Sequence, residues 1–271
     1  MNGAGAKLPV IGQHLRIPLS LAALIAFWLF TAPQLAPYDP MRTQPDRQFE
    51  APTVEYPLGT DHLGRDVLSR ILHGGQRTLI VSLAAASIAT VFGVALGLVA
   101  AGSGISAAVA SAWIRALLAL PGLLIALLLL TMLGSSPSTL AVATGIAQIA
   151  PVARMVQTST QVALTAPHVE AARALGAARP RIYRHHILPV IAGVLAASAS
   201  LAFAYSLLNS AALSYLGLGG PPGLPDWGAM LYEGRQAFRA APWLGLAPGA
   251  AITFFIWLAN RSADELARNK H

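Results

Sequence analysis

Long apolar stretches alternate with short polar ones along the chain, and their lengths predict helices that cross a membrane. A helix needs about 17 to 25 mainly apolar residues to span the hydrocarbon core of a bilayer. Six stretches with almost no charged residue are at least that long: 17–36, 79–101, 107–133, 139–161, 190–213 and 243–259. The chain is therefore expected to be an all-α polytopic membrane protein with six transmembrane helices.

The first of these stretches also has features of a secretory signal peptide. A signal peptide ends in a cleavage site of small residues, and here Pro33 and Pro37 crowd the candidate positions. An uncleaved first transmembrane helix is the better interpretation.

Polar segments divide the chain into three parts. Residues 1–78 are expected to hold an N-terminal tail, the first helix and an external loop, and residues 79–263 to form a five-helix core. A polar loop at 165–189 interrupts that core, and residues 264–271 are expected to be a C-terminal tail. Within the core, Gly93 and Gly97 lie one helical turn apart, which predicts the close approach of another helix.

Polar side chains inside the predicted spans either line a path or join helices through hydrogen bonds, because each is costly in hydrocarbon without a partner. We favour helix joining for most of them. The polar side chains in question are Gln148, Gln157, Tyr205, Ser206 and Asn209. Among them, Gln148, Tyr205 and Asn209 are the candidates for lining a path.

Composition and charge agree with a membrane protein and suggest its orientation. The chain is 55% hydrophobic, has a formal net charge of +7 and contains no cysteine, which excludes disulfides and thiolate metal sites. No basic run is interleaved with aromatic residues, so nucleic acid is not an expected partner. The face that holds both termini and the 165–189 loop carries nine basic and three acidic residues. The other face carries seven basic and eight acidic residues. Positive loops face the cytoplasm, so both termini are expected there.

The most distinctive segment is a charged island at residues 170–189, EAARALGAARPRIYRHHILP. Residues 171–175 favour a helix, Gly176 suits the left-handed position that ends it, and Pro180 suits the first turn of another. Ala171, Ala172 and Leu175 share one face of the first helix, which predicts a unit pressed against a partner protein. Four basic side chains are available to that partner or to anionic lipid headgroups: Arg173, Arg179, Arg181 and Arg184.

Other chemistry is excluded or not indicated. A phosphate-binding loop needs a lysine among glycines, and the only lysines are Lys7 and Lys270 near the ends, so this chain is not expected to hydrolyse ATP. His185 and His186 are adjacent and cannot form an i, i+4 ligand pair, so no metal site is expected. In the external loop, isolated His62 and His73 carry no strong signal, and we expect the neighbouring charges Asp61, Arg65 and Asp66 to fix the start of the second helix.

Three motifs resemble a known family. Glu170, Ala171, Ala172, Gly176, Leu188 and Pro189 have the spacing of the EAA signature in membrane subunits of ATP-binding-cassette (ABC) importers. Upstream, YPLGTDHLGRDVLSRILHGGQRTL (56–79) resembles permeases of the dipeptide, oligopeptide and nickel subfamily, and downstream SYLGLGGPPGLPDWGAML (214–231) resembles the loop before their last helix. The motifs occur in the family's order and together cover most of residues 56–260.

The resemblance implies the fold of an ABC type I importer permease in the inner membrane, of the second-permease type. It implies a homologous permease, two cytoplasmic ATPases that use ATP and Mg²⁺, and an external substrate-binding protein as partners. The coupling residues would be Glu170, Ala171, Ala172, Arg173, Gly176, Arg181, Leu188 and Pro189. Di- and oligopeptides are the first expected substrates, nickel or a metal chelate the alternative, and a membrane scaffold without transport the competing class.

Overall fold

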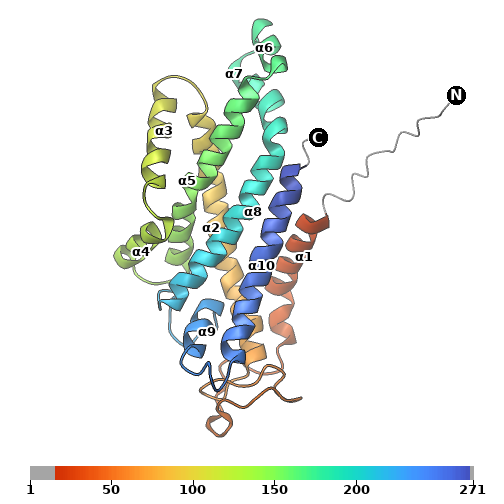
Figure 1. The fold of residues 1–271 in the computed structure, drawn as a ribbon, viewed down its shortest axis with the longest axis vertical. Helices are drawn as coiled ribbons and strands as arrows, with labels where there is room; N and C mark the ends of the chain where they lie inside the picture. Colours follow the sequence, from red (N-terminus) through yellow and green to blue (C-terminus); the bar gives the residue numbers. More distant parts are fainter. Residues whose placement is uncertain (1–15, 269–271) are drawn as a thin grey trace, which may run out of the picture.

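The computed structural model describes residues 16–268, and these residues form a bundle of long helices (Figure 1). Four helices make up most of the bundle: α2 (Val67–Ala100), α5 (Pro137–Leu164), α8 (Leu188–Tyr215) and α10 (Trp243–Arg268). Helix α2 packs against α5 and α8, and α10 packs against α8. No strand is present in this part of the chain, so the all-α expectation is confirmed.

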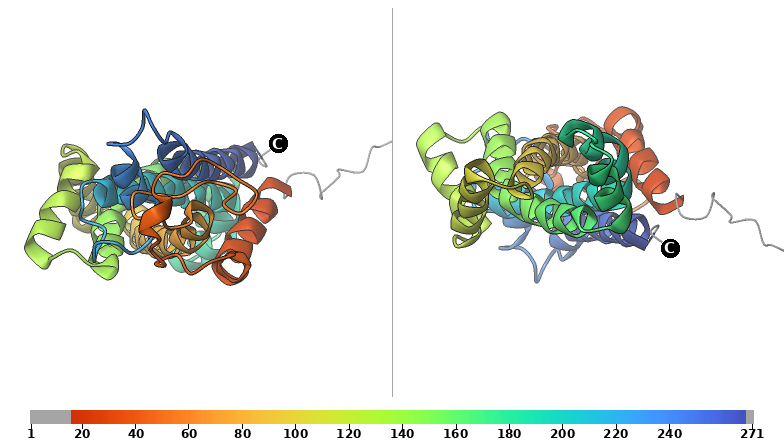
Figure 2. Two further views of the ribbon diagram at one scale, coloured as in Figure 1. Left: turned by 90° about the horizontal axis from the view of Figure 1, so that it is seen from below. Right: turned by 90° about the horizontal axis from the view of Figure 1, so that it is seen from above.

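Three further helices complete the sides of the bundle. Helix α1 (Arg16–Phe30) packs against α10 and α2. Helices α3 (Ile105–Leu118) and α4 (Gly122–Leu133) pack mainly against α2 and α5. Seen along the long axis, α3 and α4 lie at one side of the bundle and α1 lies at the opposite side (Figure 2).

The structure does not confirm the expected count of six spans. Among residues 16–268, four helices are long and apolar enough to cross a membrane, and α3 with α4 makes a fifth if that pair is one span. The two are bent by 87° around Pro121, which has no N–H to continue a helix, so the expected kink is in fact a break. The first stretch forms only a short apolar helix, Ile17–Phe30, and a 3-10 turn at Ala32–Leu35 follows it, because Pro33 has no N–H to continue the α-helix.

Several helix boundaries also differ from expectation. Helix α2 begins at Val67 instead of residue 79, because the Asp66 carboxylate caps it by accepting the Ser69 N–H at 2.8 Å. Helix α10 continues to Arg268 instead of stopping at 259, so the segment expected as a tail from 264 is helical up to that point. The rest of both expected tails, with Lys7 and Lys270, lies outside the described residues.

Two glycines allow α2 and α5 to approach each other closely, as expected. A Cβ atom on Gly97 would lie 2.6 Å from the carbonyl oxygen of Ala153 and 2.8 Å from Cβ of Val156. A Cβ atom on Gly93 would lie 2.7 Å from Cβ of Val152. Both distances are too short for real contacts, so only glycine fits this helix pair.

We predict that Gly97→Leu separates α2 from α5 and destabilises the fold by at least the ~1–3 kcal/mol typical of an overpacked core. The measurement is thermal unfolding of the purified protein in detergent. Ala95→Leu is the matched control, because Ala95 is exposed on another face of the same helix. Equal melting temperatures for the two variants would contradict the close packing at Gly97.

The two ends of the bundle differ. One end, named here the α9 end, holds the loop at 31–66 and helix α9 (Trp227–Gly234); the other, the α6–α7 end, holds α6 (Pro167–Ala174) and α7 (Arg179–Ile182) (Figure 1). The start of α1 and the end of α10 also lie at the α6–α7 end, where the backbone N–H of Ile17 donates to Glu265 Oε2 at 3.4 Å. The termini of the described chain therefore share one end with the charged island.

An aromatic cluster joins four helices near the α9 end. The rings of Trp28 on α1, Trp227 on α9 and Phe255 on α10 lie with their centroids 5.6 Å apart in each pair. Trp227 is fully buried, and its indole N–H donates to the carbonyl of Ile71 on α2 at 3.0 Å. The polar atom of the largest buried side chain is thus satisfied, and α1, α2, α9 and α10 are held in register.

Candidate functional site

The charged island folds as the two short helices that the sequence predicts. Helix α6 starts with Pro167, and the chain leaves it through Gly176, whose φ is +80°. The N–H of Ala177 donates to the carbonyl of Ala172 at 3.0 Å, and the N–H of Gly176 donates to that of Arg173 at 2.9 Å. This pair of bonds is a Schellman motif, which requires a left-handed residue at the position of Gly176.

Buried aliphatic side chains attach the island to the bundle. Val169 of α6, Ile182 of α7 and Ile187 just before α8 are 0%, 3% and 0% exposed and belong to the main hydrophobic core. Ala172 and Leu188 are half-buried. These side chains hold the island on the bundle, which fixes the orientation of its outer face.

The outer face of the island projects away from the bundle. Leu175 is 88% exposed, and the exposed residues around it are Glu170, Ala171, Arg173, Gly176 and Arg181. A Cβ atom on Gly176 would meet nothing within 4 Å, so no close neighbour within the chain explains this glycine. Within residues 16–268 the arginines at 173, 179, 181 and 184 form no ion pair. This outer face presents an apolar side chain and several free charges to a surface outside the chain.

The island is continuous with a long helix. Helix α7, a π-helical turn at Tyr183–Ile187 and α8 follow one another without a break, and together form one helical segment, Arg179–Tyr215. The π turn lies just before Pro189, which is exposed. Proline has no N–H, so Pro189 cannot donate a hydrogen bond to a carbonyl in the preceding turn. The helix of the fifth span, expected to start at 190, thus begins inside the island.

The candidate path residues do not share one surface of this chain. Gln148 on α5 is 7% exposed and lies inside the bundle. Tyr205 on α8 is 54% exposed, and Asn209, one helical turn further on, is half-buried on the same face of that helix. Their role as path-lining residues stays a prediction.

Gln157 on α5 shows the helix-joining role that we favour for polar side chains in the spans. Its amide nitrogen donates to the carbonyl of Ala100 at 3.2 Å and to the hydroxyl of Ser111 at 2.8 Å, and its oxygen accepts from Arg154 at 3.2 Å. These bonds connect α5 with the end of α2 and with α3. Ser206 is buried too, but its hydroxyl has no partner within the described chain.

A second cluster of charges lies at the α9 end. Nε of Arg65 lies 2.7 Å from Asp61 Oδ2, and Nη2 of Arg70 lies 2.8 Å from Glu233 Oε2. Cross-pairs join Arg65 to Glu233 at 3.1 Å and Arg70 to Asp61 at 3.5 Å. The side chains of Arg65 and Arg70 are only 3% and 1% exposed, so two cations and two anions neutralise each other in the interior.

Asp66 caps α2, and Asp61 pairs with Arg65 just before it, as expected for the start of this helix; the network also contains a partner that sequence reasoning missed. Glu233 lies on α9, 168 residues from Arg65. A weak signal was present, because the predicted external face carries nearly equal numbers of acidic and basic residues, but no spacing rule connects such distant positions.

The same place brings three potential metal ligands together. Ligand atoms of Asp61, His62 and Glu233 all lie within 4.8 Å of one another. The two carboxylates already contact the guanidinium groups of Arg65 and Arg70, which hold the positions and supply the charge that a cation would bring. The residues therefore fit an ion-pair network better than a metal site.

The two histidines of the island, His185 and His186, also lie apart from any such cluster in the described chain. His185 is exposed, and its Nδ1 lies 3.2 Å from the carbonyl of Arg181. The ring of His186 lies 6.0 Å from that of His168. The two adjacent histidines have different neighbours, as the sequence predicts.

Comparison with known proteins identifies the family. The profile of the binding-protein-dependent transport system inner membrane component family matches residues 93–269. The chain is 32% identical over 268 residues to the dipeptide transport system permease protein DppC of Alkalihalophilus pseudofirmus, covering 96% of this chain and 84% of that protein. It is 34% identical over 253 residues to the di/tripeptide transport system permease protein DppC of Pseudomonas aeruginosa (90% and 82% covered). The glutathione transport system permease protein GsiD of Pectobacterium atrosepticum is 34% identical over 260 residues (94% and 85% covered).

A solved structure supports the same fold. An inward-facing structure of the MetNI methionine ABC transporter contains a chain that superposes with a TM-score of 0.60 at 19% sequence identity, covering 74% of this chain and 96% of that one. At this identity the likeness shows the fold alone. With the three sequence motifs, the EAA loop geometry and the relatives, it leads to one conclusion. The chain belongs to the family of binding-protein-dependent transport system inner membrane components, the permease subunits of ABC importers.

Proposed function

We propose that this chain is one of two homologous permease subunits in an ATP-driven importer of di- and oligopeptides, and that the α6–α7 island couples it to an ATPase. One observation supports this most directly: the island is packed on its inner face, open on its outer face and continuous with α8. A loop built in this way transmits force from an outside partner into a membrane helix.

The outer face of the island suits a groove on an ATPase subunit. Burying Leu175 there would contribute roughly 2 kcal/mol, because an exposed leucine side chain gains about 1.5–3 kcal/mol on full burial. Glu170 lies in the first turn of α6, where the helix dipole favours a negative charge, and it can accept hydrogen bonds from a basic residue of the partner. Arg181 offers forked donors for partner carboxylates, and Arg173, which is exposed but also lines a cavity beside the bundle, can add another.

The remaining coupling residues set the shape of this contact. Ala171 is small and exposed, so a partner surface can approach the backbone of α6 closely. Gly176 turns the chain between α6 and α7, and Leu188 with Pro189 forms the junction where the loop becomes α8. Closure of the two ATPases on ATP would displace the island and tilt α8 with it, exposing the transport path alternately to each side.

The transport path is proposed to run along the exposed face of α8 that carries Tyr205 and Asn209. Tyr205 is 54% exposed and Asn209 is half-buried, and a homologous permease packed against this face would complete the path. Gln148 is buried inside the bundle and is better suited to holding helices together.

Charge supports an orientation with the α6–α7 end in the cytoplasm. Among the described residues this end carries the four island arginines, Arg261 and Arg268 against three acidic residues, whereas the segments at the α9 end carry seven arginines against eight acidic residues. Cytoplasmic loops are rich in arginine and lysine, and ATP and Mg²⁺ are available to partner ATPases only on that side.

The relatives favour peptides over nickel as the substrate. Their names refer to dipeptides, di- and tripeptides and glutathione, itself a tripeptide. Recognition would lie mainly in an external binding protein that delivers substrate to the α9 end.

Uptake by cells that lack this chain tests the proposal. We expect cells deleted for the chain to lose uptake of a labelled dipeptide, and complementation to restore it, with no change in uptake of labelled nickel. Detergent extracts of complemented cells should contain the chain with a second permease and ATPase subunits in comparable amounts. Co-purification of these subunits without any uptake would instead indicate a scaffold, and restored nickel uptake alone would contradict the peptide assignment.

A further inference from the structure

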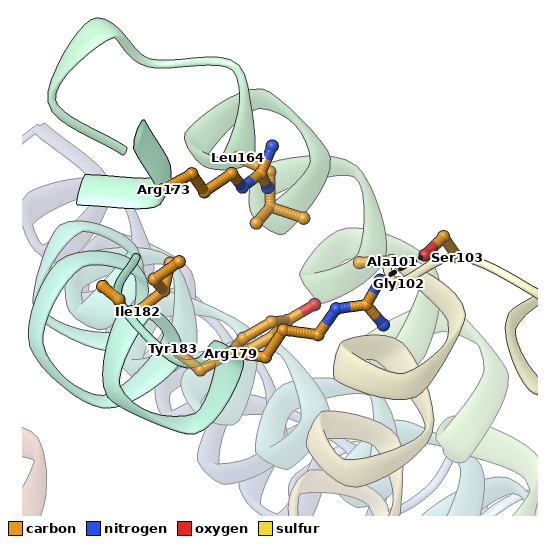
Figure 3. Close-up of a pocket in the computed structure, with 9 residues that line it drawn as sticks. Ala101, Gly102, Ser103, Leu164, Arg173, Arg179, Ile182 and Tyr183 are labelled. Carbon is orange, nitrogen blue, oxygen red and sulfur yellow. Dashed lines mark hydrogen bonds between the residues drawn. The ribbon is translucent and has the colours of Figure 1, made fainter. Parts of the chain in front are cut away.

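A cavity lies at the α6–α7 end, between the island and the bundle (Figure 3). Its volume is about 430 Å³. The chain that links α2 to α3 forms one wall with Gly102 and Ser103, and Leu164 at the end of α5 adds an apolar side. The island contributes Arg173, Arg179 and Tyr183. The cavity is therefore built from three segments that are distant in the sequence.

The polar groups of this cavity are all suited to an anion. Arg173 lies on one side and Arg179 with Tyr183 on the other, and no carboxylate lines the space between them (Figure 3). Nη2 of Arg179 donates to Oγ of Ser103 at 3.1 Å, which fixes one edge of the guanidinium and leaves its other N–H groups available. Neither arginine has an ion-pair partner within residues 16–268. Guanidinium groups with spare donors bind phosphate oxygens in paired hydrogen bonds.

The surroundings of the cavity extend this preference from a phosphate ion to a lipid. The apolar helix α3 begins immediately after Ser103 and Gly104. Ile105, Val109 and Trp113 lie at successive turns on one face of α3 and are 85%, 50% and 61% exposed. This face extends over roughly 12 Å at 1.5 Å per residue. A ligand with a phosphate in the cavity and hydrocarbon along α3 would satisfy both surfaces, whereas a free phosphate would use only the first.

We propose that this cavity binds the phosphate of an anionic membrane phospholipid, with the acyl chains of that lipid lying along the Ile105–Val109–Trp113 face of α3. Basic pockets between helices at the level of the headgroups are typical of such lipid sites. The bound phosphate would join Arg173 of α6 to Arg179 of α7 and to the end of α2. The lipid would thereby support the position of the island independently of the substrate that is carried.

Native mass spectrometry of the intact purified transporter, titrated with phosphatidylglycerol and with phosphatidylcholine of identical acyl chains, tests the site. We expect tighter binding of phosphatidylglycerol, and Arg179→Gln should weaken it by about fivefold, the effect of one basic residue near an anionic headgroup. Arg184→Gln is the matched control, because it removes the same charge from an exposed position of the island outside the cavity. Val109→Asn should also weaken binding, although it leaves the cavity intact.

Four results would overturn the proposal. Equal losses in Arg179→Gln and Arg184→Gln would show a diffuse charge effect, and equal binding of the two lipids would show that the phosphate site has no role. Competition by inorganic phosphate at concentrations comparable to those of the lipid, with no effect of Val109→Asn, would indicate a site for a free anion. Loss of ATPase subunits from the Arg179→Gln complex, with lipid binding unchanged, would assign Arg179 to a partner carboxylate.

Discussion

Replacing Gly176 with proline is expected to abolish ATP-driven uptake while the chain still folds and inserts in the membrane. Gly176 has φ of +80°, and proline is restricted to φ near −65°. The substitution also removes the N–H that donates to the carbonyl of Arg173 at 2.9 Å. Helix α6 would then leave its position relative to α7, and the outer face of the island would no longer match its partner.

Uptake of labelled dipeptide and stimulated ATP hydrolysis in reconstituted vesicles measure this effect. Gly134→Pro is the matched control, since Gly134 has φ of +84°, donates its N–H to the carbonyl of Leu130 at 2.9 Å, and has open space around it. It lies in the turn between α4 and α5, away from the island. If both variants lose uptake to the same degree, or if Gly176→Pro retains it, the island is not the coupling element.

Replacing Asp61 with alanine is expected to lower the free energy of unfolding by about 3–5 kcal/mol, the usual cost of breaking a buried ion network by removing one partner. The change leaves Arg65 and Arg70, both almost completely buried, with the single carboxylate of Glu233. It also removes the acceptor of two backbone N–H groups, those of Leu63 and Arg65, at 2.8 and 3.0 Å. The loop before α2 would lose these contacts, and the Arg65–Glu233 pair would be left to hold it to α9.

The measurement is thermal unfolding of the purified transporter, with the melting temperature determined for this subunit. Glu55→Ala is the control, because Glu55 pairs with Arg47 at 2.8 Å near the surface, and exposed pairs contribute little to stability. A melting temperature for Asp61→Ala close to that of the control would show that the network at the α9 end does not hold the fold together.

Local features of this protein were predictable because each depends on residues a few positions apart. The left-handed turn at Gly176 follows from a helix-forming run that ends in glycine, and the short helix after it follows from Pro180. The close approach at Gly93 and Gly97 follows from their helical spacing. The coupling residues could be named because their motif is local as well, although their role in coupling still depends on the proposed experiments.

Features that depend on distant segments could not be predicted in this way. The partner of Arg65 and Arg70 is Glu233 on α9, and only folding of the loop over the end of the bundle brings them together. Helix α2 extends back to Val67, where Asp66 caps it, and its buried Arg70 is paired with Asp61 and Glu233. The hydropathy pattern alone predicts a loop for that polar segment.

By itself, the sequence determined that this protein is helical and apolar, that a charged island interrupts its spans, and how that island turns, because hydropathy and backbone preference act over a few residues. Only the tertiary structure decided that α3 and α4 are separate helices bent by 87°, that α7 continues into α8, and that Arg173 and Arg179 face one cavity with the end of α2. These outcomes depend on side chains that fill or exclude the same space from remote parts of the chain, and no local pattern contains that information.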